Sequence, residues 1–179
     1  MIIIFYKSMH IVTVVGGRQA GKTALCEQWY RPGITTDSYL STVAVKSYVL
    51  PYMTLNDTPS ERRFHVHLES YYACTDVFVL VVDKDDDSDE WYSRIHHIAP
   101  EASWILLWTG VESCPKKRAW ATSLGIPLVY TYLKDAEQVD NAFKHLRRLS
   151  EKHVPRPERV PLSIVESIVD EARRWWPCV

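Results

Sequence analysis

Short apolar runs alternate along the chain with stretches in which apolar residues recur at helical spacing. Continuous or alternating apolar runs bounded by acids, prolines or glycines predict strands. These runs are Ile11–Val15, Val43–Leu50, Tyr52–Asn56, Asp76–Asp83, Trp104–Trp108 and Pro127–Tyr130. The helical stretches between and after them are Ala24–Tyr30, Ser88–Ile98, Lys116–Leu124 and Ala136–Leu149. This alternation predicts an α/β fold, with a six-stranded, mostly parallel sheet and helices on both of its faces.

The pattern changes after residue 150. Pro155, Pro157 and Pro161 lie close together, and none of them can occupy a helix interior. A helical pattern then resumes over Leu162–Trp176. We therefore predict a domain over residues 1–150, a proline-rich linker over 151–161 and an added C-terminal helix over 162–179. This aromatic helix is expected to pack against the domain or against a partner protein.

A glycine-rich stretch lies between the first predicted strand and the first predicted helix. Gly16–Thr23 fits the pattern G-x-x-x-x-G-K-[ST], in which glycines allow a tight turn that points backbone N–H groups at an anion. Lys22 would reach the outer phosphates, and Thr23 would bind a magnesium ion. We expect phosphate contacts from the loop and the first helical turn: Gly16, Arg18, Gln19, Ala20, Gly21, Lys22, Thr23 and Ala24. The alternative is a chance match.

Two further residues are candidates for the magnesium side of such a site. The hydroxyl of Thr42 could complete the magnesium shell, although a threonine entering a strand is equally ordinary. Asp57 follows a predicted strand and could hold a magnesium-bound water, although an aspartate that forms a turn fits the same position. Spacing alone leaves both alternatives open.

Composition narrows the function classes. The net charge is −1, so nothing indicates a general attraction to nucleic acid or to a membrane surface. The four cysteines are far apart, which argues against a zinc site or a disulfide framework. This cysteine usage fits a reducing compartment, and we expect an intracellular protein, cytoplasmic or nuclear. No apolar stretch approaches the length of a membrane span.

Residues from Ile11 to Leu149 resemble a Ras-superfamily small GTPase, nearest the Rab branch. The matching stretches are Tyr39–Val45, Asp57–Phe64, Ser70–Tyr72, Val77–Asp83 and Ser123–Pro127. The resemblance implies a P-loop fold that binds GTP or GDP with Mg²⁺. It makes Lys22 and Thr23 the phosphate and magnesium residues, Thr42 the threonine of the first switch, and Asp57 the aspartate of the second. Thr23, Thr42 and Asp57 would then be the magnesium residues.

The sequence departs from the family on the γ-phosphate side. Ser60 stands where the family has a glycine whose N–H contacts the γ-phosphate. Glu61 stands where a glutamine positions the attacking water, so it is only a weak catalytic candidate. Arg18 and Gln19 are larger than the residues that Rabs usually have there. These departures imply weak or absent hydrolysis.

The part of the site that would read the nucleobase departs further. Thr109–Glu112 stands where the family has N-K-x-D, so only the carboxylate of Glu112 is kept, and the asparagine that ties the loop down is lost. Tyr132–Lys134 stands where the family has S-A-K, so Lys134 follows two bulky residues. Losing polar base recognition would remove discrimination for guanine. Cys178 fits no C-a-a-X pattern, so no prenyl anchor is expected.

The region Leu107–Val169 is also similar to the centromere protein M family, small-GTPase-fold subunits of the inner kinetochore that have lost nucleotide binding. The similarity depends on Thr109-Gly110, Pro127–Tyr130 and His153–Pro155. That family lacks the intact loop seen here.

Two functions remain open. The first is a degenerate GTPase fold, a pseudo-GTPase that serves as a protein-binding scaffold or adaptor, for example in a kinetochore-type assembly. It would bind proteins through its switch-like surface and C-terminal aromatic helix, with at most weak or non-guanine-specific nucleotide binding. The alternative is an active, divergent Rab-like switch in vesicle traffic that hydrolyses GTP with Mg²⁺.

Overall fold

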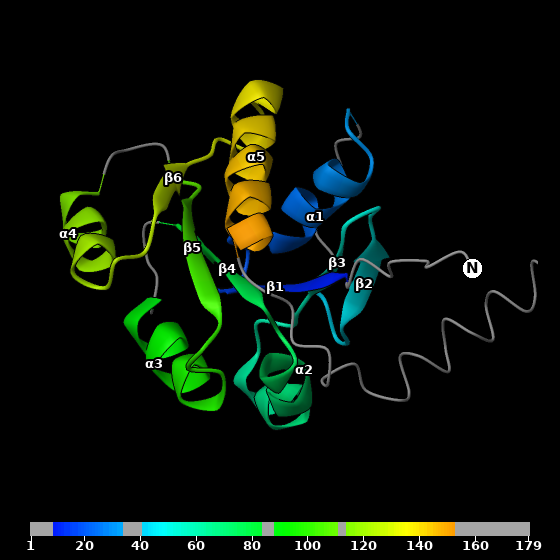
Figure 1. Cartoon of the computed structure of the whole chain (residues 1–179), viewed down its shortest axis with the longest axis vertical. Helices are drawn as coiled ribbons and strands as arrows, with labels where there is room; N and C mark the ends of the chain where they lie inside the picture. Colours follow the sequence, from blue (N-terminus) through cyan, green and yellow to red (C-terminus); the bar gives the residue numbers. More distant parts are fainter. Residues whose placement is uncertain (1–8, 34–40, 84–87, 111–113, 153–179) are drawn as a thin grey trace, which may run out of the picture.

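The computed structural model describes residues 9–33, 41–83, 88–110 and 114–152, and these residues form a single six-stranded sheet (Figure 1). The strands are β1 (His10–Gly16), β2 (Lys46–Val49), β3 (Met53–Asp57), β4 (Val77–Val82), β5 (Ser103–Trp108) and β6 (Leu128–Tyr130). Their order across the sheet is β2-β3-β1-β4-β5-β6. Only β2 runs antiparallel to its neighbour. The predicted α/β fold is therefore confirmed.

Helices cover both faces of this sheet (Figure 1). They are α1 (Lys22–Tyr30), α2 (Glu69–Ala73), α3 (Ser88–Ile98), α4 (Pro115–Ser123) and α5 (Ala136–Lys152), with a 3₁₀ helix, η1 (Arg62–Leu68), before α2. In α5 the buried residues Val139, Ala142 and Leu146 recur at helical spacing, so one stripe of the helix packs on the sheet. No helix among the described residues has the length and apolar character needed to cross a lipid bilayer.

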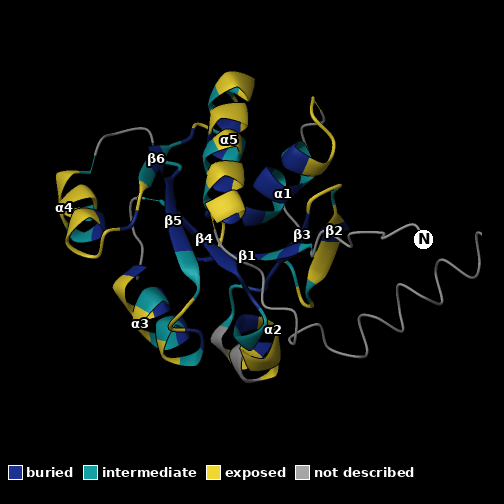
Figure 2. Cartoon of the chain, viewed as in Figure 1, coloured by how far each residue is buried: buried dark blue, intermediate teal, exposed yellow. Residues whose placement is uncertain are grey.

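The core consists of two layers separated by the sheet, and buried residues follow the strands inside the sheet, whereas the edge strand β2 is mostly exposed (Figure 2). Alternate residues of β4 supply both layers: Val77, Val79 and Val81 face the layer under α1 and α5. Phe78 and Leu80 face the other layer, which contains residues from α2, α3 and α4. Burial on both sides explains why β4 is a continuous apolar run, as expected for a central parallel strand.

The second predicted strand is wrong at its beginning. β2 starts at Lys46, whereas Val43 and Ala44 are exposed and lie outside any strand. The register explains this difference, because Lys46 pairs with Asp57, the last residue of β3. Before Lys46 the chain has no neighbouring strand to pair with, whatever its β-propensity.

Two short helices were not predicted, and one prediction cannot be compared. η1 and α2 follow one another over residues 62–73, and among the side chains that the structure describes there, only Leu68 and Tyr72 form a buried pair four residues apart. That apolar signal is too short to indicate a helix. Of the predicted linker over 151–161, the first two residues belong to α5, and the rest of the linker and the C-terminal helix lie outside the described residues. The division into domain, linker and helix therefore stays a prediction.

Candidate functional site

The glycine-rich loop lies at the carboxyl end of β1, the edge at which β3 and β4 also end. Gly16 has a φ of 138°, and a Cβ there would overlap the carbonyl oxygen of Val81. Gly21 has a φ of 95° and precedes the first residue of α1. Both positions require glycine, because side chains of L-residues rarely tolerate this backbone conformation. The predicted tight turn between strand and helix is therefore present.

The side chains of the loop divide into exposed and buried ones. Arg18 and Gln19 are exposed, and Gln19 also has a positive φ, of 63°. Ala20 is buried, whereas Ala24 is half-buried in the first turn of α1. No side-chain hydrogen bond caps the N-terminus of α1, and the N-terminus of a helix favours an anionic ligand.

Lys22 is buried, with 7% of its surface exposed, and its side chain folds back over the loop. Its Nζ donates hydrogen bonds to the carbonyl oxygens of Gly16, at 2.9 Å, and Gly17, at 2.7 Å. A positive charge is therefore held inside the turn, next to the N-terminus of α1. The lysine and the helix dipole both favour a negatively charged ligand there.

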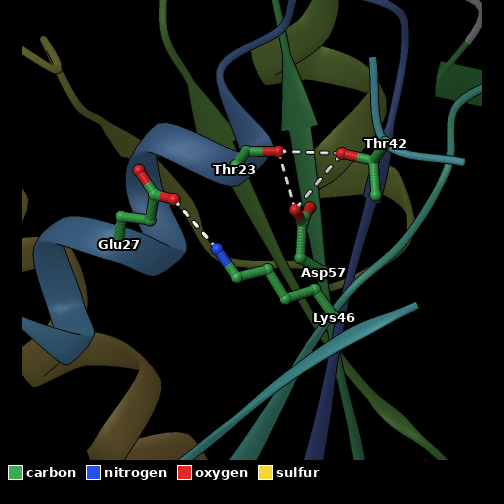
Figure 3. Close-up of polar contacts among 5 residues, drawn as sticks. All are labelled: Thr23, Glu27, Thr42, Lys46 and Asp57. Carbon is green, nitrogen blue, oxygen red and sulfur yellow. Dashed lines mark hydrogen bonds and ion pairs between the residues drawn. The ribbon is translucent and has the colours of Figure 1, made fainter. Parts of the chain in front are cut away.

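Thr23, Thr42 and Asp57 come together beside the loop (Figure 3). The hydroxyl of Thr23 donates to Asp57 Oδ2 at 2.6 Å and lies 3.1 Å from the hydroxyl of Thr42. The Thr42 hydroxyl is 3.5 Å from the same carboxylate oxygen. These residues come from α1, from the segment before β2 and from the end of β3. The structure thus assembles the three residues that were expected to serve a magnesium ion.

Asp57 is fully buried, and its Oδ1 atom has no hydrogen-bond partner among the described residues. Burial raises the pKa of this carboxyl, and the hydrogen bond from Thr23 and the charge of Lys22 only partly oppose that rise. A buried carboxylate oxygen without a partner is costly, and a cation would relieve the cost. Mg²⁺ prefers oxygen ligands and usually binds through one or two carboxylates together with substrate phosphates. The hydroxyls and carboxylate of this cluster fit that ion.

A surface ion pair lies beside the cluster (Figure 3). Lys46 Nζ, at the start of β2, is 3.1 Å from Glu27 Oε1 on α1. The Lys46 side chain is 55% exposed, so the pair contributes little to stability. The ion pair joins the beginning of β2 to α1, the helix that carries Thr23.

Glu61, the candidate for positioning water, has another partner. Glu61 directly precedes η1, and its Oε2 forms an ion pair with Nε of Arg63, in the first turn of η1, at 2.7 Å. Ser60 and Glu61 are both half-buried in the connection that follows Asp57. The structure thus pairs this carboxylate with Arg63, whereas Thr23, Thr42 and Asp57 contact one another.

The opposite side of the loop faces the carboxyl ends of β5 and β6. The Thr109 hydroxyl is 3.2 Å from the carbonyl oxygen of Ala20 and 3.1 Å from that of Val82. The asparagine that ties the loop down in the family is absent here, and the threonine at its position contacts the loop instead. No sequence pattern pointed to this role.

The remaining residues on this side are small, apolar or exposed. A Cβ on Gly110 would lie 2.7 Å from the Trp108 ring, so the indole packs closely against this glycine. The side chain of Leu133 lies against Gly21, and its carbonyl accepts a hydrogen bond from Gln28 at 2.9 Å. Lys134 is exposed. Glu112, the predicted remnant of the base reader, lies outside the described residues.

Comparisons with known proteins point to one superfamily. The family model described as "Ras of Complex, Roc, domain of DAPkinase" matches residues 11–112, more than half of the chain. The GTP-binding protein ypt1 of Schizosaccharomyces pombe is 26% identical over 164 residues, which cover 80% of each chain. The Ras-related protein RABD1 of Arabidopsis thaliana is 26% identical over 159 residues, which cover 77% of each chain.

Proposed function

Because the chain belongs to the Roc family of Ras-like GTPase domains, we propose that its loop holds the phosphates of a nucleotide together with Mg²⁺. We further propose that the domain acts mainly as a protein-binding scaffold, with weak or absent hydrolysis and little preference for guanine. The observation that carries the binding proposal is the cluster of Thr23, Thr42 and Asp57, in which one oxygen of a fully buried carboxylate has no hydrogen-bond partner within the described part of the chain.

Each part of the loop has a role in this proposal. Lys22 and the backbone N–H groups at the start of α1 bind phosphate oxygens. Thr23, Thr42 and Asp57 hold Mg²⁺. When the ion is bound, its charge would neutralise part of the negative charge of the phosphates. Asp57 also keeps the Thr23 hydroxyl oriented toward the cluster through the 2.6 Å hydrogen bond.

The scaffold half of the proposal is supported by the residues around the site. Glu61 is paired with Arg63 and adds negative charge where the family has a neutral glutamine. At the other end, Thr109 is engaged with main-chain carbonyls, and Leu133 presents an apolar side chain. Thr42 contacts the cluster while Val43, next to it, is 64% exposed. A protein partner could therefore reach the switch-like surface directly.

The second candidate function is an active Rab-like switch that hydrolyses GTP. It is favoured by the same cluster of Thr23, Thr42 and Asp57, which a protein without nucleotide chemistry has no need to keep. One relative is named as a GTP-binding protein, and the other is named as a Ras-related protein. A place in a kinetochore-type assembly stays a prediction, since neither relative bears on it.

The test of nucleotide binding starts with protein purified from cells. We would denature it, identify any released nucleotide, and titrate fresh protein with GTP, GDP, ATP and ADP, with Mg²⁺ or with a chelator. We expect each nucleotide to raise the melting temperature only when Mg²⁺ is present. If no nucleotide is released and none changes the melting temperature, the binding proposal fails. A strong preference for guanine nucleotides with rapid turnover would favour the switch.

The Asp57→Asn substitution should remove the magnesium dependence of binding. The amide keeps the size of the side chain but lacks the charge, and a charge-assisted contact contributes roughly 1.5–3 kcal/mol, or about 10- to 100-fold in affinity. Calorimetric titration with Mg²⁺ and nucleotide measures this loss. Asp76→Asn is the matched control, because Asp76 is a buried carboxylate that accepts the N–H of Ile11 at 2.8 Å, at the opposite edge of the sheet. Equal magnesium dependence in wild type and Asp57→Asn would contradict the assignment.

The Glu61→Gln substitution should raise the rate of GTP hydrolysis by about tenfold. It removes a negative charge near the phosphates, breaks the ion pair with Arg63 and provides an amide that can orient water. Phosphate release in a single turnover measures the rate. Glu151→Gln on α5, which breaks a surface ion pair with Arg147, is the control and should change nothing. A fast wild-type rate that Glu61→Gln lowers would instead show that Glu61 is catalytic.

A further inference from the structure

The phosphate loop is held at three points. At the beginning of the loop, the carbonyls of Gly16 and Gly17 accept hydrogen bonds from Lys22. At its end, the hydroxyl of Thr23 donates to Asp57. At its middle, the hydroxyl of Thr109 lies 3.2 Å from the carbonyl oxygen of Ala20. The first two contacts come from within the loop and from the magnesium side. The third comes from the other side, from a residue that follows β5.

Thr109 is itself held firmly by the sheet. Its backbone N–H donates to the carbonyl of Val82 at 2.8 Å, which extends the pairing of β5 with β4 by one residue. Its hydroxyl is 3.1 Å from the same carbonyl. The backbone of Thr109 is therefore fixed relative to the end of β4, and from there its side chain reaches the loop.

The contact determines the direction of one peptide group. In a trans peptide the C=O of one residue and the N–H of the next point in opposite directions. The described residues contain no cis peptide bond. Because the Ala20 carbonyl points at Thr109, the Gly21 N–H points away from Thr109. Gly21 directly precedes α1, so this N–H belongs to the group of amides that face an anion at the helix N-terminus.

We propose that Thr109 is a positioning residue for phosphate binding, which acts by orienting the Ala20–Gly21 peptide. The proposal rests on the proposed binding of nucleotide phosphates at this loop. It assigns Thr109 to the phosphates, although the residue lies on the side where a nucleobase would be read. The effect of Thr109 is therefore the same for every ligand that carries the phosphates, whichever base it has.

The Thr109→Val substitution tests this assignment, because valine has the same shape but no hydroxyl. We expect the affinities for GTP, ATP and inorganic triphosphate, each with Mg²⁺, to fall together by about tenfold, the usual effect of losing one hydrogen bond. Thr109→Ser, which keeps the hydroxyl, should bind all three ligands nearly as wild type does. Thr75→Val is the matched control, because the Thr75 hydroxyl also donates to a main-chain carbonyl, that of Tyr71 at 2.8 Å, away from the loop.

Two results of the titrations would overturn the proposal. If Thr109→Val binds the three ligands as wild type does, the residue does not position the loop. If only GTP binding falls, Thr109 reads the base.

Failure of the proposed function has a separate readout. Should wild type bind none of the ligands, amide hydrogen exchange over the Gly16–Thr23 loop in the free protein still tests positioning. We expect faster exchange in Thr109→Val than in Thr75→Val or wild type. Unchanged exchange would reject the assignment of Thr109, whether or not nucleotide binds. Thr109→Ala is the second variant if the valine protein does not fold.

Discussion

Replacing Lys22 with alanine is expected to lower the affinity for Mg²⁺–nucleotide by at least about 100-fold. The ammonium is buried inside the turn and donates to two loop carbonyls, so it is already positioned for a phosphate. Charged hydrogen bonds contribute roughly 1.5–3 kcal/mol each, and they are stronger where water is excluded. The loss should be seen as an absent melting-temperature shift on addition of nucleotide and as undetectable heat in calorimetric titration.

Lys46→Ala is the control for the loss of a positive charge near the site. Lys46 lies beside the same cluster, but its ammonium is paired with Glu27 on the surface. We expect this variant to bind nucleotide within about twofold of wild type, since exposed ion pairs contribute little. If Lys22→Ala and Lys46→Ala weaken binding equally, then the loop lysine has no special role and the ligand is attracted only by the general charge of this surface.

Replacing Gly16 with alanine is expected to cause the largest loss of stability, by more than about 3 kcal/mol. The added Cβ would overlap the carbonyl oxygen of Val81, and the φ of 138° is one that L-residues rarely adopt. Neither atom can move easily, because Val81 and Gly16 are paired in neighbouring strands of the central sheet. Thermal unfolding should show a melting temperature lower by about 10 °C, since each kcal/mol corresponds to roughly 2–4 °C in a domain of this size.

The Gly125→Ala substitution distinguishes the two causes of the expected destabilisation, which are overlap of the added Cβ with a neighbouring atom and the positive φ of the backbone. Gly125 also has a positive φ, of 68°, but a Cβ there would meet no atom within 4 Å. We expect this variant to lose only about 1 kcal/mol, the ordinary cost of a side chain in this backbone region. Comparable destabilisation by the two substitutions would show that the overlap with Val81 is relieved by a small shift of the sheet.

The phosphate loop and the central strands could be predicted because their signals are local. Gly16, Gly21, Lys22 and Thr23 lie within a few residues of one another, in a pattern whose spacing reflects the turn itself. The continuous apolar run of β4 likewise indicates, from the sequence alone, a strand that is buried on both faces of the sheet. For Thr42 and Asp57 the sequence left open whether they serve a magnesium ion or are an ordinary strand-entry threonine and a turn-forming aspartate. The fold places both side chains against Thr23.

The contacts on the other side of the loop depend on residues far apart in the chain. Thr109 and Ala20 are separated by 89 positions, and their contact requires β5 to lie next to β4 and β4 next to β1. A threonine hydroxyl that takes over a tethering contact leaves no pattern in a single sequence. The early start assigned to β2 has a similar cause, because where a strand begins depends on where its partner, β3, ends.

The two layers of the core also divide the tryptophans, the main source of the protein's fluorescence, into two groups. Among the described residues, Trp91, Trp104, Trp108 and Trp120 belong to the layer under α3 and α4. Trp29 belongs to the other layer, where its indole N–H donates to the carbonyl of Val139 at 3.0 Å and its ring lies 5.4 Å from that of Phe143. Trp29 is on α1, the helix that begins at Lys22. The fluorescence of Trp29 therefore reports on the helix that follows the phosphate loop. Substituting the other tryptophans would leave Trp29 as the source of the tryptophan emission.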